Sequence, residues 1–435
     1  MNAYRSLRVA LLGAGSVGSQ VARLLIEQSD ELAQRSGARL ELVGIAVRNL
    51  DAPRDTDLPA ELYTTDAESL ILGADIVIEL MGGVEPARTY ILQALRSGAD
   101  VVTGNKALLA QHGPEIFATA EQVGAAVRYE AAVGGAIPII RPLRESLAGD
   151  RVDRILGIVN GTTNFILDRM DQTGSSLEDA FAPATELGYA EADPTADIGG
   201  YDAQQKAAIL ASLAFHTSVP VDAVHREGIT SVTAAQIESA KKAGYVVKLL
   251  AICERVPNPE SGRDGVSARV YPALIPRVHP LAAVHGGNNA VFVEAHAAGP
   301  LMFYGAGAGG VQTASAVLGD VVSVARRHVV GGPSLAETSH ADVDLLSIGD
   351  IATRYAITLT VADAPGVLAS IAQLFAEHGV SVEQLEQHVN ESGTATLVIG
   401  THQARESALA DTVASLQASP VVVAVESVLR VEGVS

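Results

Sequence analysis

The sequence predicts an α/β protein in three parts: a parallel sheet covered by helices on both faces, a mixed α+β middle part, and a small βαββαβ unit at the end. Strand-like and helix-like patterns alternate through residues 1–150, which is typical of a parallel sheet. The patterns after residue 353 follow the order of a ferredoxin-like domain. A length of 435 residues suits two or three domains. We therefore expect a first domain over 1–150, completed by a helix from 311–330, a second domain over 151–310, a linker over 331–352 and a third domain over 353–435.

Composition and charge exclude several classes of protein. The chain has 50 acidic residues against 30 lysines and arginines, and its net charge of −20 repels nucleic-acid phosphates and anionic lipids. The single cysteine, Cys253, can form no internal disulfide and no cysteine-rich metal site. No apolar run reaches the ~18 residues of a membrane span, and the first residues lack a signal-peptide core. We expect a cytoplasmic protein without a nucleic-acid or membrane partner.

The first domain contains several apolar segments with the length of buried strands, over 7–12, 40–47, 75–80 and 100–103. A helix-like pattern from Val17 to about Arg35 follows the first of them. Pro86 opens another helix that runs through Ser97, and the first turn is a favoured position for proline. Open sheets of this kind bind ligands at the carboxyl ends of their strands.

The turn after the first strand has the pattern G-x-G-x-x-G, with glycines at Gly13, Gly15 and Gly18. The first glycine allows a tight turn, the second lets a pyrophosphate approach the backbone, and the third allows close packing of helix on strand. The N-terminus of the following helix adds partial positive charge for the phosphates. Because the motif lies between an apolar strand and a helix, it predicts a Rossmann-type domain that binds NAD or NADP.

The choice between NAD and NADP depends on the end of the second strand. An acidic residue about 20 positions after the glycine loop marks a preference for NAD. Here the second strand comes later and ends with Val47-Arg48-Asn49. Arg48 would meet the 2′-phosphate of NADP, whereas Asp51 lies close enough to keep NAD open. We favour NADP.

The rest of the chain divides into a mixed region and a regular end. The mixed region has a strand over 153–159, a helix after 160–164, an Ala-rich helix over 201–215, short strands within 268–300, a glycine-rich loop at 305–310 and a helix over 313–327. The end has strands over 355–361, 380–388, 394–401 and 421–431, with helices over 367–377 and 407–417.

Residues 188–206 place several acidic side chains before one lysine that begins an apolar helix. Asp202 and Lys206 lie four positions apart and share one face of that helix. A capped helix with one exposed ion pair would explain the pattern. Alternatively, the acids hold a substrate ammonium group and the lysine moves a proton. A second lysine, Lys106, follows the end of a predicted strand, where ligands bind, although a solvated loop lysine fits there equally well.

Several segments together resemble the homoserine dehydrogenase family, in order along essentially the whole chain. They are the glycine loop at 13–18, Glu79-Leu80-Met81-Gly82-Gly83, Gly104-Asn105-Lys106-Ala107, residues 130–138, Asn160-Gly161-Thr162-Thr163-Asn164, residues 188–206, and 305–310 followed by Thr313-Ala314. The 188–206 segment is highly specific to that family, whereas the glycine loop alone is not. The resemblance implies reversible NAD(P)H-dependent reduction of L-aspartate 4-semialdehyde to L-homoserine, in threonine, methionine and isoleucine biosynthesis.

The resemblance also implies roles for individual residues. Lys206 would pass a proton to the aldehyde oxygen as the hydride arrives, and Lys106 would lie beside the nicotinamide and polarise that oxygen. Glu191 would hold the substrate ammonium group. The other substrate-binding residues are expected to be Asp197, Asp202, Tyr189, Gly161 and Thr162. Cofactor contacts are expected from Gly13, Gly15, Ser16, Val17, Gly18, Arg48, Met81, Gly82, Lys106 and Gly309.

In this family the loop that matches 130–138 holds a monovalent cation, usually sodium, largely through backbone carbonyl oxygens. The resemblance carries that site onto Glu130, Val133, Gly135 and Ile137. Hard oxygen ligands suit such an ion. A purely structural loop remains the alternative, because carbonyl ligands leave no signature in the side chains.

The C-terminal segment resembles an ACT domain, a module that binds regulatory small molecules, through its βαββαβ order and its Asp363-Ala364-Pro365-Gly366-Val367-Leu368 turn. In this family such a domain commonly confers inhibition by L-threonine. We expect threonine to bind at the interface of paired ACT domains in a homodimer or homotetramer, near Asp363, Pro365, Gly366, Val367 and Leu368. The N–H groups after the turn would meet its carboxylate. A dimerising module without an effector is the alternative.

Two rival functions stay open. The first is another aldehyde or oxo-acid oxidoreductase on the same fold. An acylating semialdehyde dehydrogenase would need a nucleophilic cysteine in a Gly/Asn-rich turn, and Cys253 lies in an apolar stretch instead. The second is a non-catalytic amino-acid sensor, against which the intact Lys106, Glu191 and Lys206 argue.

Overall fold

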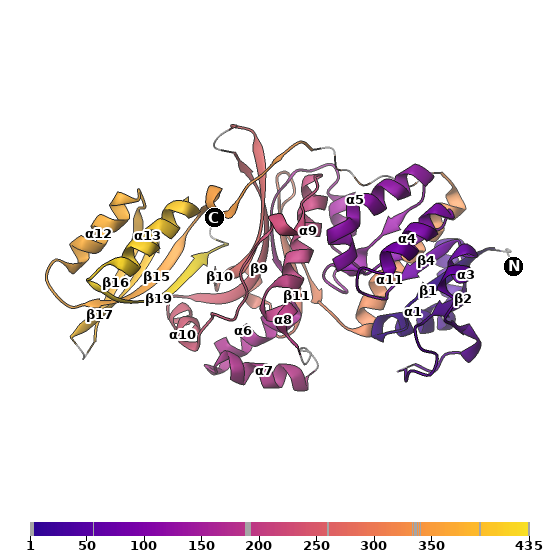
Figure 1. Ribbon diagram of the computed structural model, residues 1–435, viewed down its shortest axis with the longest axis horizontal. Coiled ribbons are helices and arrows are strands. Elements are labelled where there is room, and N and C mark those ends of the chain that lie inside the picture. Colours follow the sequence, from indigo (N-terminus) through magenta and orange to yellow (C-terminus); the bar gives the residue numbers. More distant parts are fainter. Residues whose placement is uncertain are drawn as a thin grey trace. The chain divides into compact units, whose positions relative to one another are not determined.

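The computed structural model describes residues 4–54, 56–187, 193–258, 261–332, 334, 337, 339, 341–390 and 393–433. The chain forms two compact units, drawn in Figure 1. The first unit comprises 1–153, 205–221 and 289–342, and the second comprises 154–204, 222–288 and 343–435. No helix within the described residues is long and apolar enough to cross a membrane.

The sheet of the first unit is parallel and has the strand order β3-β2-β1-β4-β5-β6. Its strands are β1 (Arg5–Leu12), β2 (Ala38–Ala46), β3 (Tyr63–Thr64), β4 (Ile76–Glu79), β5 (Asp100–Thr103) and β6 (Val127–Arg128). The strand order reverses between β1 and β4, which is the point where doubly wound sheets bind their ligands. The predicted Rossmann-type fold is confirmed.

Of the helices on this sheet, those over 67–72 and 106–123 were not predicted from the sequence. The helices are α1 (Ser16–Glu27), α2 (Ser29–Ser36), α3 (Ala67–Leu72), α4 (Ala87–Arg96) and α5 (Lys106–Val123). The single helix expected from Val17 to Arg35 is two helices, because the chain leaves helical geometry at Gln28. Asp30 and Glu31 lie in the first turn of α2, where negative charge favours the start of a helix.

A late segment of the chain completes the core of this sheet. Helix α11 (Gly310–Val330) contacts α1, α2 and β5, as can be followed in Figure 1. Its buried side chains Val317, Val321 and Val324 belong to the same apolar cluster as Leu7, Val9 and the other residues of β1. Strands β11 (Asn288–Ala295) and β12 (Gly299–Ala306), which are neighbours, precede it.

Asp100 ties α11 to the sheet. Its fully buried carboxylate accepts a hydrogen bond from the Ala126 N–H at 2.6 Å, forms an ion pair with Arg327, and lies 2.9 Å from Nε2 of His328. Burial alone would raise the pKa of Asp100, but His328, Arg327 and the Ala126 N–H outweigh it and hold that pKa below its ordinary value.

We expect Asp100→Asn to lower the free energy of unfolding at pH 7 by about 3 kcal/mol, because it leaves the cation of Arg327 without its buried partner. A carboxyl group with a lowered pKa stabilises the fold above its unfolded-state pKa, and this contribution is lost as the pH falls through the folded-state value. The deficit of the variant should therefore shrink towards pH 3. Urea unfolding at both pH values measures the free energy of unfolding.

Asp30→Asn, at an exposed pair with Arg39, is the control and should change this free energy little. Equal effects of the two substitutions would contradict the prediction.

The sheet of the second unit runs in the order β7-β9-β10-β19-β15-β17-β16, and β8 and β13 also pair with β10. The strands are β7 (Val152–Ile158), β8 (His225–Arg226), β9 (Tyr245–Pro257), β10 (Asp264–Pro276), β13 (Asp344–Leu345), β15 (Tyr355–Ala362), β16 (Val382–Val389), β17 (Thr394–Thr401) and β19 (Val422–Val431). A separate pair joins β14 (Ala352–Thr353) to β18 (Ala404–Arg405). The helices are α6 (Gly161–Thr173), α7 (Leu177–Glu186), α8 (Thr195–Ile198), α9 (Tyr201–Phe215, shared with the first unit) and α10 (Ala234–Lys242).

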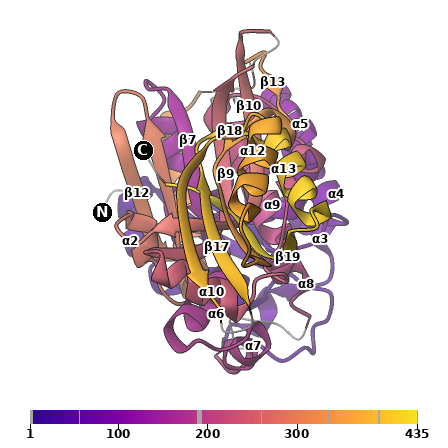
Figure 2. The same ribbon diagram turned by 90° about the vertical axis from the view of Figure 1, so that its left-hand side faces the viewer.

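The end of the chain forms the predicted βαββαβ domain. Helices α12 (Val367–Glu377) and α13 (Glu406–Ala418) pack together on one face of its sheet, as Figure 2 shows. Alternate residues of β15, such as Ile357 and Leu359, point into that core. One feature was not predicted: β19 also pairs in parallel with β10, at Ala273–Arg430 and Leu274–Val431, so the sheet of this domain continues the sheet of the middle region.

Candidate functional site

The glycine loop after β1 has the geometry of a dinucleotide-binding turn. Gly13 has φ +99°, and a Cβ there would lie 2.7 Å from the Leu80 carbonyl oxygen. A Cβ on Gly18 would lie 2.1 Å from the carbonyl oxygen of Gly13. At Gly15, by contrast, a Cβ would meet no atom within 4 Å. The outer glycines therefore close the turn, and the middle one leaves open space at the N-terminus of α1, which fits a pyrophosphate.

The second glycine-rich loop meets the first one. A Cβ on Gly310 would lie 2.7 Å from the carbonyl oxygen of Ser16, and Gly309 has φ +126° immediately before α11. The structure thus brings Gly309 next to the start of α1, together with Ser16 and Val17. This proximity joins two predicted cofactor segments that are almost 300 residues apart in the sequence.

A buried carboxylate organises the ends of β4 and β5. Glu79 accepts hydrogen bonds from the Met81 N–H at 2.8 Å and from the Thr103 hydroxyl at 2.7 Å. Burial raises the pKa of Glu79, and these hydrogen bonds offset only part of that rise. The side-chain amide of Asn105 donates to the Gly83 carbonyl at 2.7 Å, and its oxygen caps α5. These contacts fix the backbone of Met81 and Gly82 and the start of α5. Lys106, the first residue of α5, therefore lies at the carboxyl edge of the sheet.

The residues expected to select between NAD and NADP both lie beyond the end of β2. Arg48 and Asp51 are exposed and follow Ala46, the last residue of that strand. The choice of cofactor stays a prediction.

Two of the predicted substrate acids share one amide. Asn160 caps α6, and its side-chain nitrogen donates to Asp197 at 2.7 Å and to Asp202 at 2.9 Å. Asn160 and Asp202 are buried, and so is Thr162 in the first turn of α6, directly after Gly161. Sequence reasoning did not select Asn160, although it lies in a quoted motif. Its signal was the capping position of an asparagine directly before a predicted helix.

Lys206 is buried on α9, with 9% of its surface exposed, one turn after Asp202 on the same helix face. Burial of a lysine and of an acid at this spacing disfavours the interpretation as an exposed ion pair. Tyr189 and Glu191, the other acid expected to bind substrate, lie outside the described residues.

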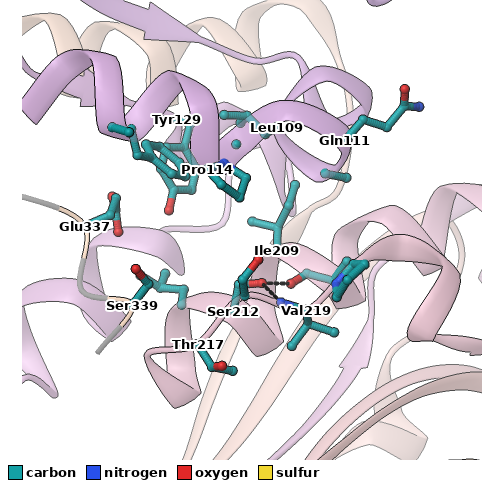
Figure 3. A pocket seen from close by; sticks show the side chains of 18 of the residues that line it. Leu109, Gln111, Pro114, Tyr129, Ile209, Ser212, Thr217, Val219, Glu337 and Ser339 are labelled. Atoms are coloured by element: carbon teal, nitrogen blue, oxygen red, sulfur yellow. Dashed lines mark hydrogen bonds between the residues drawn. The ribbon is translucent and has the colours of Figure 1, made fainter. Parts of the chain in front are cut away.

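Helices α5 and α9 face a common cavity within the first unit, of about 350 Å³. Leu109, Pro114, Ile209 and Ser212 line it, and the Ser212 hydroxyl accepts from the Val219 N–H and donates to the Ala208 carbonyl (Figure 3). Each catalytic candidate lies one turn before a lining residue, Lys106 before Leu109 and Lys206 before Ile209. The two lysines themselves are not among the residues that line this cavity.

A buried lysine that sequence reasoning missed lies beside α6 in the second unit. Nζ of Lys248 donates to the Asn164 side-chain oxygen at 2.9 Å and to the Val284 carbonyl at 2.6 Å. Burial lowers the pKa of Lys248 to about 8. Asn164 is the last residue of the motif that begins at Asn160, so the hydrogen bond from Lys248 fixes the first turn of α6. No sequence signal separated it from other lysines, because its burial is a tertiary property.

The loop expected to hold a cation is tightly built. The Glu130 carboxylate accepts hydrogen bonds from the N–H groups of Ile139, Ile140 and Arg141, at 2.6, 2.8 and 2.9 Å. Its side chain is thereby used internally, so any ion would depend on carbonyl oxygens of this loop. Val133 and Ile137 are buried, and a Cβ on Gly135 would lie 2.4 Å from the Gly307 carbonyl oxygen. Among the described residues, no cluster of His, Cys, Asp or Glu side chains has the arrangement of a metal site.

The turn expected to bind an effector precedes α12. Asp363, Pro365, Gly366 and Leu368 are exposed, and Gly366 has φ +92°. Val367 is buried in the core of the C-terminal domain, and its backbone N–H donates to the Ala364 carbonyl at 3.4 Å.

Cys253 lies fully buried in β9, and burial raises the pKa of its thiol to about 12. A protonated, inaccessible thiol is not a nucleophile, which argues against an acylating semialdehyde dehydrogenase.

These features define a nicotinamide-dependent dehydrogenase: a Rossmann-type domain with an open glycine loop, a buried acid and a buried lysine one turn apart on α9, and a C-terminal βαββαβ domain. Comparison with known families agrees. The model of the homoserine dehydrogenase NAD-binding domain matches residues 13–130, that of homoserine dehydrogenase matches 138–322, and that of the ACT domain matches 355–420.

Similar proteins point the same way. A homoserine dehydrogenase from Corynebacterium glutamicum is 53% identical, over 98% of this chain and 95% of that protein. The crystal structure of a homoserine dehydrogenase from Thiobacillus denitrificans is similar with a TM-score of 0.91 at 38% identity, over 99% of each chain. A hyperthermophilic archaeal homoserine dehydrogenase in complex with NADPH matches 75% of this chain and 99% of its own, with a TM-score of 0.61 at 27% identity. The chain belongs to the homoserine dehydrogenase family and is an oxidoreductase with an NAD-binding domain and an ACT domain.

Proposed function

We propose that this enzyme catalyses the reversible reduction of L-aspartate 4-semialdehyde to L-homoserine, within threonine, methionine and isoleucine biosynthesis. The observation that carries the proposal is the buried Lys206 on α9, one turn after an acid that Asn160 links to a second acid. A buried cation suits a carbonyl oxygen that becomes negative during reduction. Neighbouring carboxylates suit the ammonium group of an amino-acid aldehyde.

The proposal gives the residues separate roles in catalysis and in substrate binding. The nicotinamide, when bound, supplies the hydride. Lys206 donates a proton to the aldehyde oxygen, and Lys106 polarises the same oxygen. Glu191 binds the substrate ammonium group, with Asp197 and Asp202 beside it, and Tyr189, Gly161 and Thr162 complete the pocket. Asn160 keeps Asp197 and Asp202 in fixed positions.

The cofactor contacts belong to the same proposal. Gly13, Gly15, Ser16, Val17 and Gly18 form the pyrophosphate turn, with Met81, Gly82, Lys106 and Gly309 around the remainder of the cofactor. We favour NADP over NAD because Arg48 follows β2 and is exposed. We also propose a monovalent cation, sodium, bound by carbonyl oxygens of Glu130, Val133, Gly135 and Ile137.

Regulation and assembly complete the proposal. L-threonine inhibits by binding near Asp363, Pro365, Gly366, Val367 and Leu368, between ACT domains of a cytoplasmic homodimer or homotetramer. The support is the exposed turn with its αL glycine before α12. For the domains we keep the boundaries 1–150 with the helix from 311–330, 151–310, 331–352 as linker, and 353–435.

The test is oxidation of NADPH and NADH with L-aspartate 4-semialdehyde, followed by titration with L-threonine. We expect turnover with both cofactors or with NADPH alone. Faster turnover with NADPH than with NADH would support the proposed role of Arg48, and the reverse would argue against it. No turnover with either cofactor would overturn the reaction and favour the sensor. If threonine changes neither the rate of turnover nor the thermal stability, the proposal that threonine is an effector is wrong, but the proposed reaction stands.

A further inference from the structure

A cluster of charged side chains joins the last strand of the ACT domain to the middle region. Arg430, on β19, forms ion pairs with Glu406 of α13 and, at 2.9 Å, with Glu227, which directly follows β8. Its guanidinium carbon also lies 4.4 Å from the ring centre of Tyr271, on β10. Arg430 is therefore held by its own domain and by the strands of the middle region at once.

Glu227 belongs to a short segment that is closely fitted to its surroundings. Its N–H donates to the Val270 carbonyl at 2.7 Å, and its carboxylate also contacts His225 at 2.7 Å. Burial by itself raises the pKa of Glu227, but the hydrogen bonds from His225 and Arg430 outweigh it and lower that pKa to about 2. The carboxylate is thus charged at any pH at which the enzyme would work.

The segment over residues 226–229 is in close contact with the turn between α8 and α9. A Cβ on Gly228 would lie 2.2 Å from the Ile198 carbonyl oxygen, and the Ile229 N–H donates to that same oxygen at 2.8 Å. Arg226 donates to the Gly199 carbonyl, and its guanidinium carbon lies 3.6 Å from the ring centre of Tyr201. Residues 226–229 therefore contact the turn at several positions between Ile198 and Tyr201.

The turn itself carries the acids described above. Asp197 lies directly before Ile198, and Asp202 directly after Tyr201. The contacts from Arg430 through Glu227 and residues 226–229 therefore end at the two carboxylates that Asn160 holds.

We propose that Glu227 is a positioning residue for these carboxylates, and that its ion pair with Arg430 makes the last strand of the ACT domain part of the support of the substrate site. This role holds whether or not the ACT domain binds an effector. The expected change in KM rests on the proposed function, whereas the expected change in hydrogen exchange does not.

The test compares two carboxylate-to-amide substitutions in the full-length enzyme. Glu227→Gln removes the charge facing Arg430. Glu383→Gln is the matched control, because Glu383 pairs with Arg354 at 3.0 Å and its side chain is 46% exposed, against 41% for Glu227. We expect Glu227→Gln to raise KM for L-homoserine about 5- to 10-fold, with KM for the cofactor changed less than about twofold. Glu227→Asp, which keeps the charge, should recover part of the loss. Glu383→Gln should change neither constant.

A measurement independent of turnover accompanies the kinetics. The amide protons of Ile198, Gly199 and Gly200 are hydrogen-bonded within the turn, to Pro194, Thr195 and Asp197. Their hydrogen exchange should be faster in Glu227→Gln and unchanged in Glu383→Gln. Equal exchange in the two variants would overturn the proposal. So would an equal rise of both KM values, since a general loss of structure does not discriminate between substrate and cofactor. Absence of turnover in the parent, with faster exchange in Glu227→Gln, would overturn the proposed reaction but support the positioning role.

Discussion

Replacement of Lys206 by alanine is expected to lower kcat for the reduction of L-aspartate 4-semialdehyde by at least about 100-fold, with a smaller change in KM for the cofactor. A positioned general acid contributes roughly this factor or more. Lys206 is buried on α9, so bulk water has poor access to replace it as the proton donor. The measurement is steady-state kinetics with NADPH for the parent and the variant.

Two further variants make the result specific. Lys206→Met keeps the length of the side chain and separates loss of the proton from loss of packing, so it should be as inactive as the alanine variant. Lys241→Ala removes an exposed lysine on α10 and should leave kcat within about twofold. A loss below about tenfold for both Lys206 variants would remove the acid/base role. The same substitutions at Lys106 would then show which lysine dominates.

The second large effect is expected at the glycine loop. The Cβ of Gly18→Ala would lie 2.1 Å from the carbonyl oxygen of Gly13, so the backbone of the loop or of α1 must move. Overpacking of this kind costs about 1–3 kcal/mol. We expect Tm without cofactor to fall by at least about 3 °C, and the Kd for NADPH to rise by at least about tenfold. Calorimetry and cofactor titration measure the two quantities.

Gly15→Ala is the matched comparison in the same loop. Its Cβ meets no protein atom within 4 Å, so Tm without cofactor should stay within about 1 °C of the parent. The Kd for NADPH should nevertheless rise at least about tenfold, because the methyl group occupies the space that we propose for the pyrophosphate. Unchanged NADPH affinity in Gly15→Ala would place the cofactor elsewhere, whatever the result for Gly18→Ala.

The features that the sequence predicted well are local ones. Apolar runs predicted β1, β4 and β5, the G-x-G-x-x-G motif predicted the turn into α1, and the periodicities after residue 353 predicted the βαββαβ domain. Each of these depends on residues within about one turn or strand of one another, so a single sequence contains the information. The motif segments likewise predicted the family that the comparisons show.

Tertiary structure decided which distant residues act together. Asn160 meets Asp197 and Asp202 some 40 positions later, Gly310 reaches Ser16, and Arg430 pairs with Glu227 about 200 positions earlier. The pairing of β19 with β10 is of the same kind. One sequence specifies the residue types in such pairs but not their partners, because a hydrogen bond or an ion pair depends on distance in space, which the folded backbone alone sets.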